Sequence, residues 1–221
     1  MNTNRLKRPA VAWGAGLSAG LLSLGLALAG ATQAQHSAPA GAGVVDEPEA
    51  TTEAPRRVPR WILQGPGGRA VTALDFAGRY QLVAFGYVSC PDVCPTTMLE
   101  MQQVLASLGE VARKVQPLFI SVDPQRDSLP VLAEYTRSFD DRIIGLTSRP
   151  ELVAVAAKAF DVRYEIVREP GAAANAYTVD HTAGLFLVGP EGQLLTRFGY
   201  STPVDQVVAR IRRWLEAEPQ R

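Results

Sequence analysis

Two cysteines stand between a strand-like and a helix-like stretch of this 221-residue chain, which contains no others. Cys90 and Cys94 follow the apolar run 81–88 and precede a run at 95–114 in which apolar residues recur at helical spacing. A second apolar run follows at 117–122. A strand, a helix and a second strand in this order form a right-handed crossover with parallel strands. Open α/β sheets carry their sites at the carboxyl ends of such strands, so the cysteine pair predicts a metal or redox site there.

The rest of the pattern predicts an α/β domain. Besides the strand–helix–strand unit, the predicted elements are a hairpin at 61–74, helices at 128–139, 150–160 and 203–216, a short strand at 143–146 and a hairpin at 185–198. This order is typical of a thioredoxin-like fold. We therefore expect a central mixed sheet flanked by helices, with an N-terminal hairpin extension.

The N-terminus has the layout of an export signal. Arg5, Lys7 and Arg8 form a positive patch, and residues 9–35 contain no charge. A positive start, a short apolar centre and small residues at its end are typical of a secretory signal peptide, here 1–35. The same span could serve as a membrane anchor. In either case the positive patch stays in the cytoplasm and the rest is exported, to the periplasmic side of the inner membrane.

Residues 36–57 are rich in Pro, Ala, Gly, Thr and Glu, and they predict a flexible linker because so little apolar surface is available for burial. Residues 58–221 form one domain of ordinary size. Lys and Arg together number 22, as do Asp and Glu, so the net charge is zero. No basic stripe or phosphate-binding loop is present, which argues against a nucleic-acid partner.

The spacing of the two thiols allows more than one chemistry. Residues four positions apart lie on the same side of a helical turn, so Cys90 and Cys94 could close a disulfide or hold one soft metal ion. Cys94, at the predicted start of a helix, is expected to feel the positive end of the helix dipole, which favours the thiolate. A permanent disulfide is the structural alternative, but cross-linking so short a loop stabilises a fold little.

His181 is the other candidate ligand, because it is the one histidine of the predicted domain. A buried histidine held by hydrogen bonds is the alternative, and spacing alone would favour it. Two thiolates and an imidazole make three donors, whereas closed structural zinc sites normally use four. Thiolates particularly favour Cu(I), so the donor set predicts copper.

Three motifs occur together in this order: Cys-Pro-Asp-Val-Cys-Pro at 90–95, Ser-Val-Asp-Pro-Gln-Arg-Asp at 121–127 and Val-Asp-His at 179–181. With them the chain resembles the SCO/SenC family of thioredoxin-fold copper proteins. The resemblance implies that Cys90, Cys94 and His181 bind one copper ion, as Cu(I) or Cu(II). It also implies a copper donor protein, an N-terminal membrane segment and an acceptor, the binuclear copper site of cytochrome c oxidase subunit II.

These features favour a copper metallochaperone, a binding protein rather than an enzyme with turnover. The alternative is an exported thiol-disulfide reductase, or a copper or redox sensor, in which Cys90 and Cys94 are the redox-active pair. The C-x-x-x-C spacing differs from the C-x-x-C of typical oxidoreductases. His181 discriminates between the two, because a reductase has no need of it.

Three further features carry weaker predictions. Asp123 either orients a metal ligand through a hydrogen bond or turns the chain out of its strand. Met98 and Met101 could pass copper through their thioethers, but their helical spacing favours the core. Residues 163–176 are predicted to form a mobile loop that carries partner contacts.

Overall fold

A five-stranded mixed sheet forms the centre of the computed structural model, which describes residues 58–217. The strand order is β5-β4-β3-β8-β9. The strands are β3 (Tyr80–Gly86), β4 (Val115–Ser121), β5 (Ile144–Leu146), β8 (Leu185–Val188) and β9 (Leu194–Phe198). β3, β4 and β5 run parallel, whereas β8 and β9 are antiparallel to their neighbours. Because Gly86 pairs with Ser121, β3 and β4 end side by side at one edge of the sheet.

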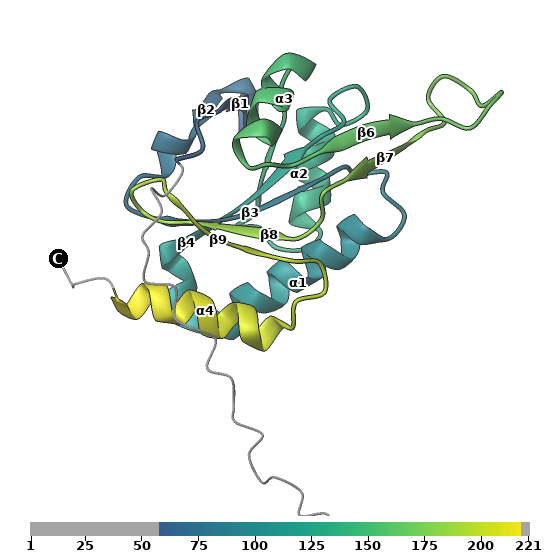
Figure 1. Cartoon of the computed structure of the whole chain (residues 1–221). Coiled ribbons are helices and arrows are strands. Elements are labelled where there is room, and N and C mark those ends of the chain that lie inside the picture. Colours follow the sequence, from purple (N-terminus) through teal and green to yellow (C-terminus); the bar gives the residue numbers. More distant parts are fainter. Residues whose placement is uncertain (1–57, 218–221) are drawn as a thin grey trace, which may run out of the picture. The chain divides into compact units, whose positions relative to one another are not determined.

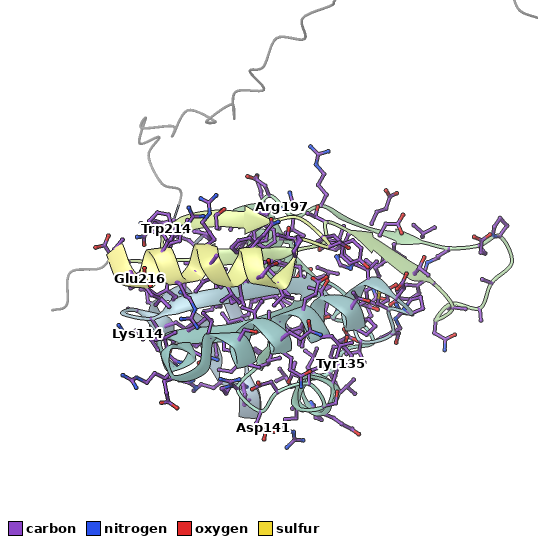
Figure 2. The ribbon with its side chains drawn as sticks, turned by 90° about the horizontal axis from the view of Figure 1, so that it is seen from below. Lys114, Tyr135, Asp141, Arg197, Trp214 and Glu216 are labelled. Carbon is purple, nitrogen blue, oxygen red and sulfur yellow. The ribbon has the colours of Figure 1, made fainter. Side chains whose placement is uncertain are left out.

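Helices cover both faces of this sheet (Figure 1). The helices are α1 (Val93–Leu108), α2 (Leu129–Arg137), α3 (Pro150–Ala159) and α4 (Val204–Ala217). α1 and α4 lie side by side on one face, as Figure 2 also shows, and the hydroxyl of Tyr80 donates a 2.8 Å hydrogen bond to the Trp214 carbonyl of α4. α3 packs on the opposite face together with an antiparallel hairpin of β1 (Ile62–Gln64) and β2 (Ala70–Thr72). α2 packs against β5.

Burial on both faces explains why every residue of β3 and β4 is buried and why these strands read as continuous apolar runs. The predicted thioredoxin-like α/β fold and its N-terminal hairpin extension are confirmed. Helix α1 is shorter than predicted, because Gly109 has a φ of +61° and the chain continues as a 3-10 helix (Gly109–Lys114). Glycine adopts such a φ without steric cost.

The segment predicted as a loop before His181 contains a strand. β6 (Tyr164–Val167) pairs with β7 (Thr178–His181) in a separate two-stranded sheet, a projecting hairpin that Figure 1 shows extending from the domain. Only residues 168–177 connect its strands. β6 is short and mostly exposed, and its sequence carries only a brief strand signal, an alternation of apolar and polar residues over 162–166.

The predicted signal or anchor and the predicted linker lie outside the described residues, so these boundaries remain predictions. Within 58–217, no helix has the length and apolar character needed to cross a bilayer.

Candidate metal centre

The structure brings together the three residues that the sequence singled out as ligands. Cys90 lies in the loop after β3, Cys94 in the first turn of α1, and His181 at the end of β7. One donor atom from each residue lies within 4.8 Å of the other two. The Sγ atom of Cys94 is 3.3 Å from Nε2 of His181, so the fold closes an 87-residue separation to direct contact.

Backbone hydrogen bonds fix both sulfur atoms. The Tyr87 N–H donates to Sγ of Cys94, and the Cys94 N–H donates to Sγ of Cys90, each at 3.4 Å. Neither cysteine is in a disulfide. Gly86 provides the space, because a Cβ atom there would lie 2.7 Å from Sγ of Cys94. The end of β3 therefore needs glycine for the sulfur to pack against the strand.

The two thiols differ in electrostatic environment, and the thiolate is favoured at Cys90 instead of at Cys94, where it was predicted. Burial raises the pKa of the Cys94 thiol well above its ordinary value. For Cys90, burial acts in the same direction, but backbone hydrogen bonds from Asp92 and Cys94, together with the side chains of Cys94 and Tyr87, outweigh it and lower the pKa. The expectation that Cys94 is the thiolate is therefore wrong, because the N–H groups at the start of α1 point at the sulfur of the preceding loop.

This difference predicts the order of alkylation. In the reduced, copper-free protein, iodoacetamide should modify Cys90 first, and its rate should reach half-maximum at a lower pH than the rate at Cys94. Cys90 is half-buried whereas Cys94 is 2% exposed, so the reagent also reaches Cys90 more easily. Mass spectrometry of peptides from a pH series measures both rates. Faster modification of Cys94 would contradict this assignment.

His181 is poised as a neutral donor. Burial lowers its pKa, against the opposing effects of the Thr182 carbonyl and Asp180. Nδ1 lies 3.2 Å from that carbonyl, which can only accept a hydrogen bond. Nδ1 therefore carries the proton, and the lone pair of Nε2 faces Cys94. A hollow of about 360 Å³ in the hairpin surface, lined in part by Asp180 and Thr182, also borders His181.

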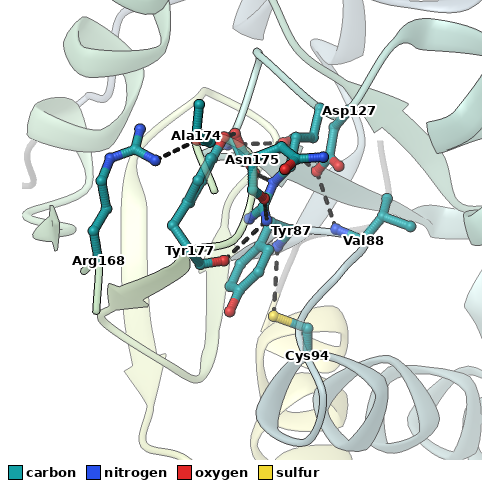
Figure 3. A network of polar contacts seen from close by, with 11 residues as sticks. Tyr87, Val88, Cys94, Asp127, Arg168, Ala174, Asn175 and Tyr177 are labelled. Carbon is teal, nitrogen blue, oxygen red and sulfur yellow. Dashed lines mark hydrogen bonds and ion pairs between the residues drawn. The ribbon is translucent and has the colours of Figure 1, made fainter. Parts of the chain in front are cut away.

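The β4–α2 loop (residues 122–128) connects the cysteine loop to the projecting hairpin. Asp127 accepts hydrogen bonds from the Val88 N–H at 3.0 Å and from the Ser121 hydroxyl at 2.6 Å. Asp123 is 2% exposed and pairs with Arg126. Figure 3 shows this network at the end of β3. Through Asp127, the β4–α2 loop therefore fixes the backbone at Val88, just before the segment that carries Cys90 and Cys94.

Asp123 contacts no candidate ligand among the described residues; it accepts a 2.7 Å hydrogen bond from the Tyr177 hydroxyl. Met98 and Met101 are fully buried in the core beneath the sheet, as their spacing indicated. Three residues near the centre were not expected from the sequence: Tyr87, Arg126 and Tyr177. Arg126 had a signal, because it stands in one of the three motifs that carried the resemblance.

Comparison with known proteins decides the family. A sequence model of the SCO1/SenC family matches residues 49–216. The chain belongs to the SCO1/SenC family. Human "Protein SCO1 homolog, mitochondrial" is 34% identical over 167 residues, covering 72% of this chain and 55% of that protein. Mouse "Protein SCO2 homolog, mitochondrial" is 37% identical over 145 residues, covering 65% and 56%. This SCO1/SenC chain thus spans about 55% of the length of these curated relatives.

Solved structures of the SCO1/SenC family share the fold. Bradyrhizobium japonicum ScoI with copper bound is 34% identical with a TM-score of 0.64, over 71% of this chain and 98% of that one. Yeast Sco1 with copper bound is 30% identical with a TM-score of 0.67, over 75% and 92%. Arabidopsis thaliana ScoI with copper bound is 28% identical with a TM-score of 0.67, over 73% and 99%.

Proposed function

We propose that this SCO1/SenC protein is a copper metallochaperone that holds one copper ion, as Cu(I) or Cu(II), on Cys90, Cys94 and His181. The observation that carries the proposal is the convergence of two sulfurs and one imidazole nitrogen within 4.8 Å. Neither cysteine is in a disulfide, and burial lowers the pKa of His181, which favours the neutral imidazole that metal binding requires. Thiolates select Cu(I), and three donors fall short of a closed zinc site. Copper-bound relatives support the choice of metal.

Copper is the cargo, and it leaves by ligand exchange. Cys90 and His181 are only partly buried, so an acceptor's donor atom can reach the metal while Cys94 still holds it from beneath. Each new bond then replaces an old one, and no free ion is released. Oxidation of Cys90 and Cys94 to a disulfide removes two of three donors, which couples copper loading to the redox state of the pair.

The destination that we propose is the binuclear copper site of cytochrome c oxidase subunit II, with a separate copper donor protein upstream. Family membership supports this assignment. We place the domain on the periplasmic side of the inner membrane, exported by the N-terminal segment and held there if that segment is retained. The charge and hydropathy pattern of residues 1–35 supports this location, and two curated relatives are mitochondrial proteins.

A transfer assay tests this function. The Cu(I)-loaded full-length protein is mixed anaerobically with the reduced, copper-free soluble domain of subunit II, and after mild oxidation the absorption of the binuclear site is followed. Copper should move to the acceptor with one ion lost per chain. The Cys90→Ser variant, carried through the same loading steps, should deliver none. Copper that stays on the wild-type protein would contradict delivery to this acceptor.

The difference between the two thiols supports a second function, thiol-disulfide reductase. The Cys90 thiolate would attack an acceptor disulfide, and one acceptor sulfur would leave as a thiolate. Cys94, after losing its proton, would then attack Cys90 in the mixed disulfide. The acceptor gains two thiols and this protein gains one disulfide. Reduction of the acceptor by copper-free protein, unchanged in His181→Ala, would favour this alternative.

A further inference from the structure

Arg126 is packed between two tyrosine rings beside the candidate metal centre. Its guanidinium carbon lies 3.6 Å from the ring centroid of Tyr177 and 5.5 Å from that of Tyr87. Arg168 lies over the Tyr177 ring at 4.4 Å, and the ring of Tyr87 is edge-on to His181 at 6.1 Å. These contacts form a continuous packed series from the tip of the projecting hairpin to a candidate copper ligand, part of which Figure 3 shows.

Hydrogen bonds fix Arg126 against the loop that leads into β7. Its Nε pairs with Asp123, and Nη1 donates to the Tyr177 carbonyl at 2.9 Å and the Asn175 carbonyl at 3.3 Å. Tyr177 immediately precedes β7, whose last residue is His181. The remaining nitrogen, Nη2, is buried and has no partner within the part of the chain that the structure describes. A buried donor without a partner is costly, so the other contacts must hold this guanidinium firmly.

Tyr87 continues the connection to both sides of the centre. Burial raises its pKa, and a backbone hydrogen bond from Val179 in β7 acts against this effect. The backbone N–H of Tyr87 donates to Sγ of Cys94. Tyr87 thus contacts β7, His181 and a candidate sulfur ligand at once, and Arg126 packs on its ring.

The hairpin needs such side-chain contacts. Within residues 58–217, β6 and β7 pair only with each other and not with the five-stranded sheet. Both strands are largely exposed; Ile166, for example, is 39% exposed. Backbone ladder bonds therefore do not fix β7 relative to the cysteines, which belong to the β3–α1 segment. The position of His181 therefore depends on the side chains that pack against β7 and against the loop that leads into it.

We propose that Arg126 is a positioning residue for the copper centre: it holds the start of β7 through Tyr177, and so keeps Nε2 of His181 at the two thiols. This inference rests on the proposed copper site. Planarity and the fork of donors matter, because the guanidinium stacks on two rings while it bonds to a carboxylate and two carbonyls. A lysine offers the charge without this geometry.

Two measurements on the full-length protein test the proposal. One is Cu(II) affinity by chelator competition, with the sulfur-to-copper absorption band as its signature. The other is amide hydrogen exchange of the copper-free protein. Arg126→Gln should weaken copper binding about 10- to 100-fold, as loss of an outer-sphere partner commonly does, and should shift the band. Exchange should accelerate in β7 and stay unchanged in β3 and β4, which shows that the fold is intact.

Further variants separate stacking from charge. Tyr177→Leu should behave like Arg126→Gln, whereas Tyr177→Phe keeps the ring and should retain most of the affinity. Arg126→Lys should not rescue binding. Arg142→Gln is the matched control, because it also removes an arginine–aspartate pair, in this case with Asp140. This pair lies just before β5, at the end of the strand that faces away from the candidate metal centre. The variant should therefore leave copper affinity unchanged.

The proposal would be overturned if Arg126→Gln kept the copper affinity, the absorption band and the β7 hydrogen exchange of the wild-type protein. Wild-type copper affinity in Arg126→Lys would overturn the role of stacking. If the wild-type protein itself binds no copper, the proposed function fails. Hydrogen exchange would then still decide whether Arg126 holds β7, so the two failures are distinguishable.

Discussion

Replacing Cys94 by serine should lower the affinity for Cu(I) by more than about 100-fold, which exceeds the 10- to 100-fold that changes around a metal centre cost. The Cys94 sulfur is the innermost of the three donors, in contact with Nε2 of His181 and held by the Tyr87 N–H. A serine hydroxyl fits the same space, but it is a hard donor that soft Cu(I) disfavours. Competition with a Cu(I) chelator under reducing, anaerobic conditions measures the change.

Met98→Leu is the matched control for this prediction. It also removes one sulfur atom from α1, but Met98 is fully buried among core side chains. Copper stoichiometry and affinity should stay at the wild-type values, with a small loss of stability because the swap conserves volume. Similar copper losses in Cys94→Ser and Met98→Leu would argue against a site built on the cysteine pair.

Gly86→Ala should damage stability and copper binding together. The new Cβ atom would lie 2.7 Å from Sγ of Cys94 and 2.9 Å from Cε2 of Phe119, distances at which atoms must move. Overpacking of this kind commonly costs about 1–3 kcal/mol of unfolding free energy. Because one displaced atom is a candidate ligand, copper affinity should also fall, by about tenfold or more. Urea unfolding and chelator competition measure the two effects.

Gly145→Ala separates the two effects. A Cβ atom there would lie 2.9 Å from Cβ of Leu132, so the substitution also overpacks a strand of the same sheet. Its stability loss should be comparable, but Leu132 belongs to α2, away from the three candidate ligands. Copper affinity should therefore be retained. Unchanged copper affinity in Gly86→Ala would show that the space beside Cys94 has no influence on the centre.

Much of the fold was predictable because strong local signals agree with the tertiary environment. β3 and β4 are buried on both faces, and their centres therefore appear as apolar runs at 82–86 and 117–120. Helix starts were recognisable from Pro130 and Pro150, which occupy the first turns of α2 and α3. The hairpin of β6 and β7 was missed because each strand has only 4 residues, and the alternation of apolar and polar residues at 162–166 and 177–180 is too short to stand out.

The candidate site was predictable in its members but not in its electrostatics. Cys90, Cys94 and His181 are conspicuous because the domain has so few cysteines and histidines, and their motifs resemble one family. Which thiol has the lowered pKa depends on where the first N–H groups of α1 point, and no sequence pattern specifies that direction. Arg126 stands in one of the three motifs, but its contacts were hidden, because its partners Tyr87 and Tyr177 lie far from it in the sequence.

The most direct test of the copper centre is an anaerobic titration of Cu(II) into the reduced full-length protein and its His181→Ala variant, followed by absorption and chelator competition. We expect the wild-type protein to bind one copper ion per chain with strong sulfur-to-copper charge-transfer absorption. The variant should bind at least about 100-fold more weakly, with a changed spectrum, because one of three donors is gone. Equal affinity and spectra for the two proteins, or no copper on either, would contradict a centre built from Cys90, Cys94 and His181.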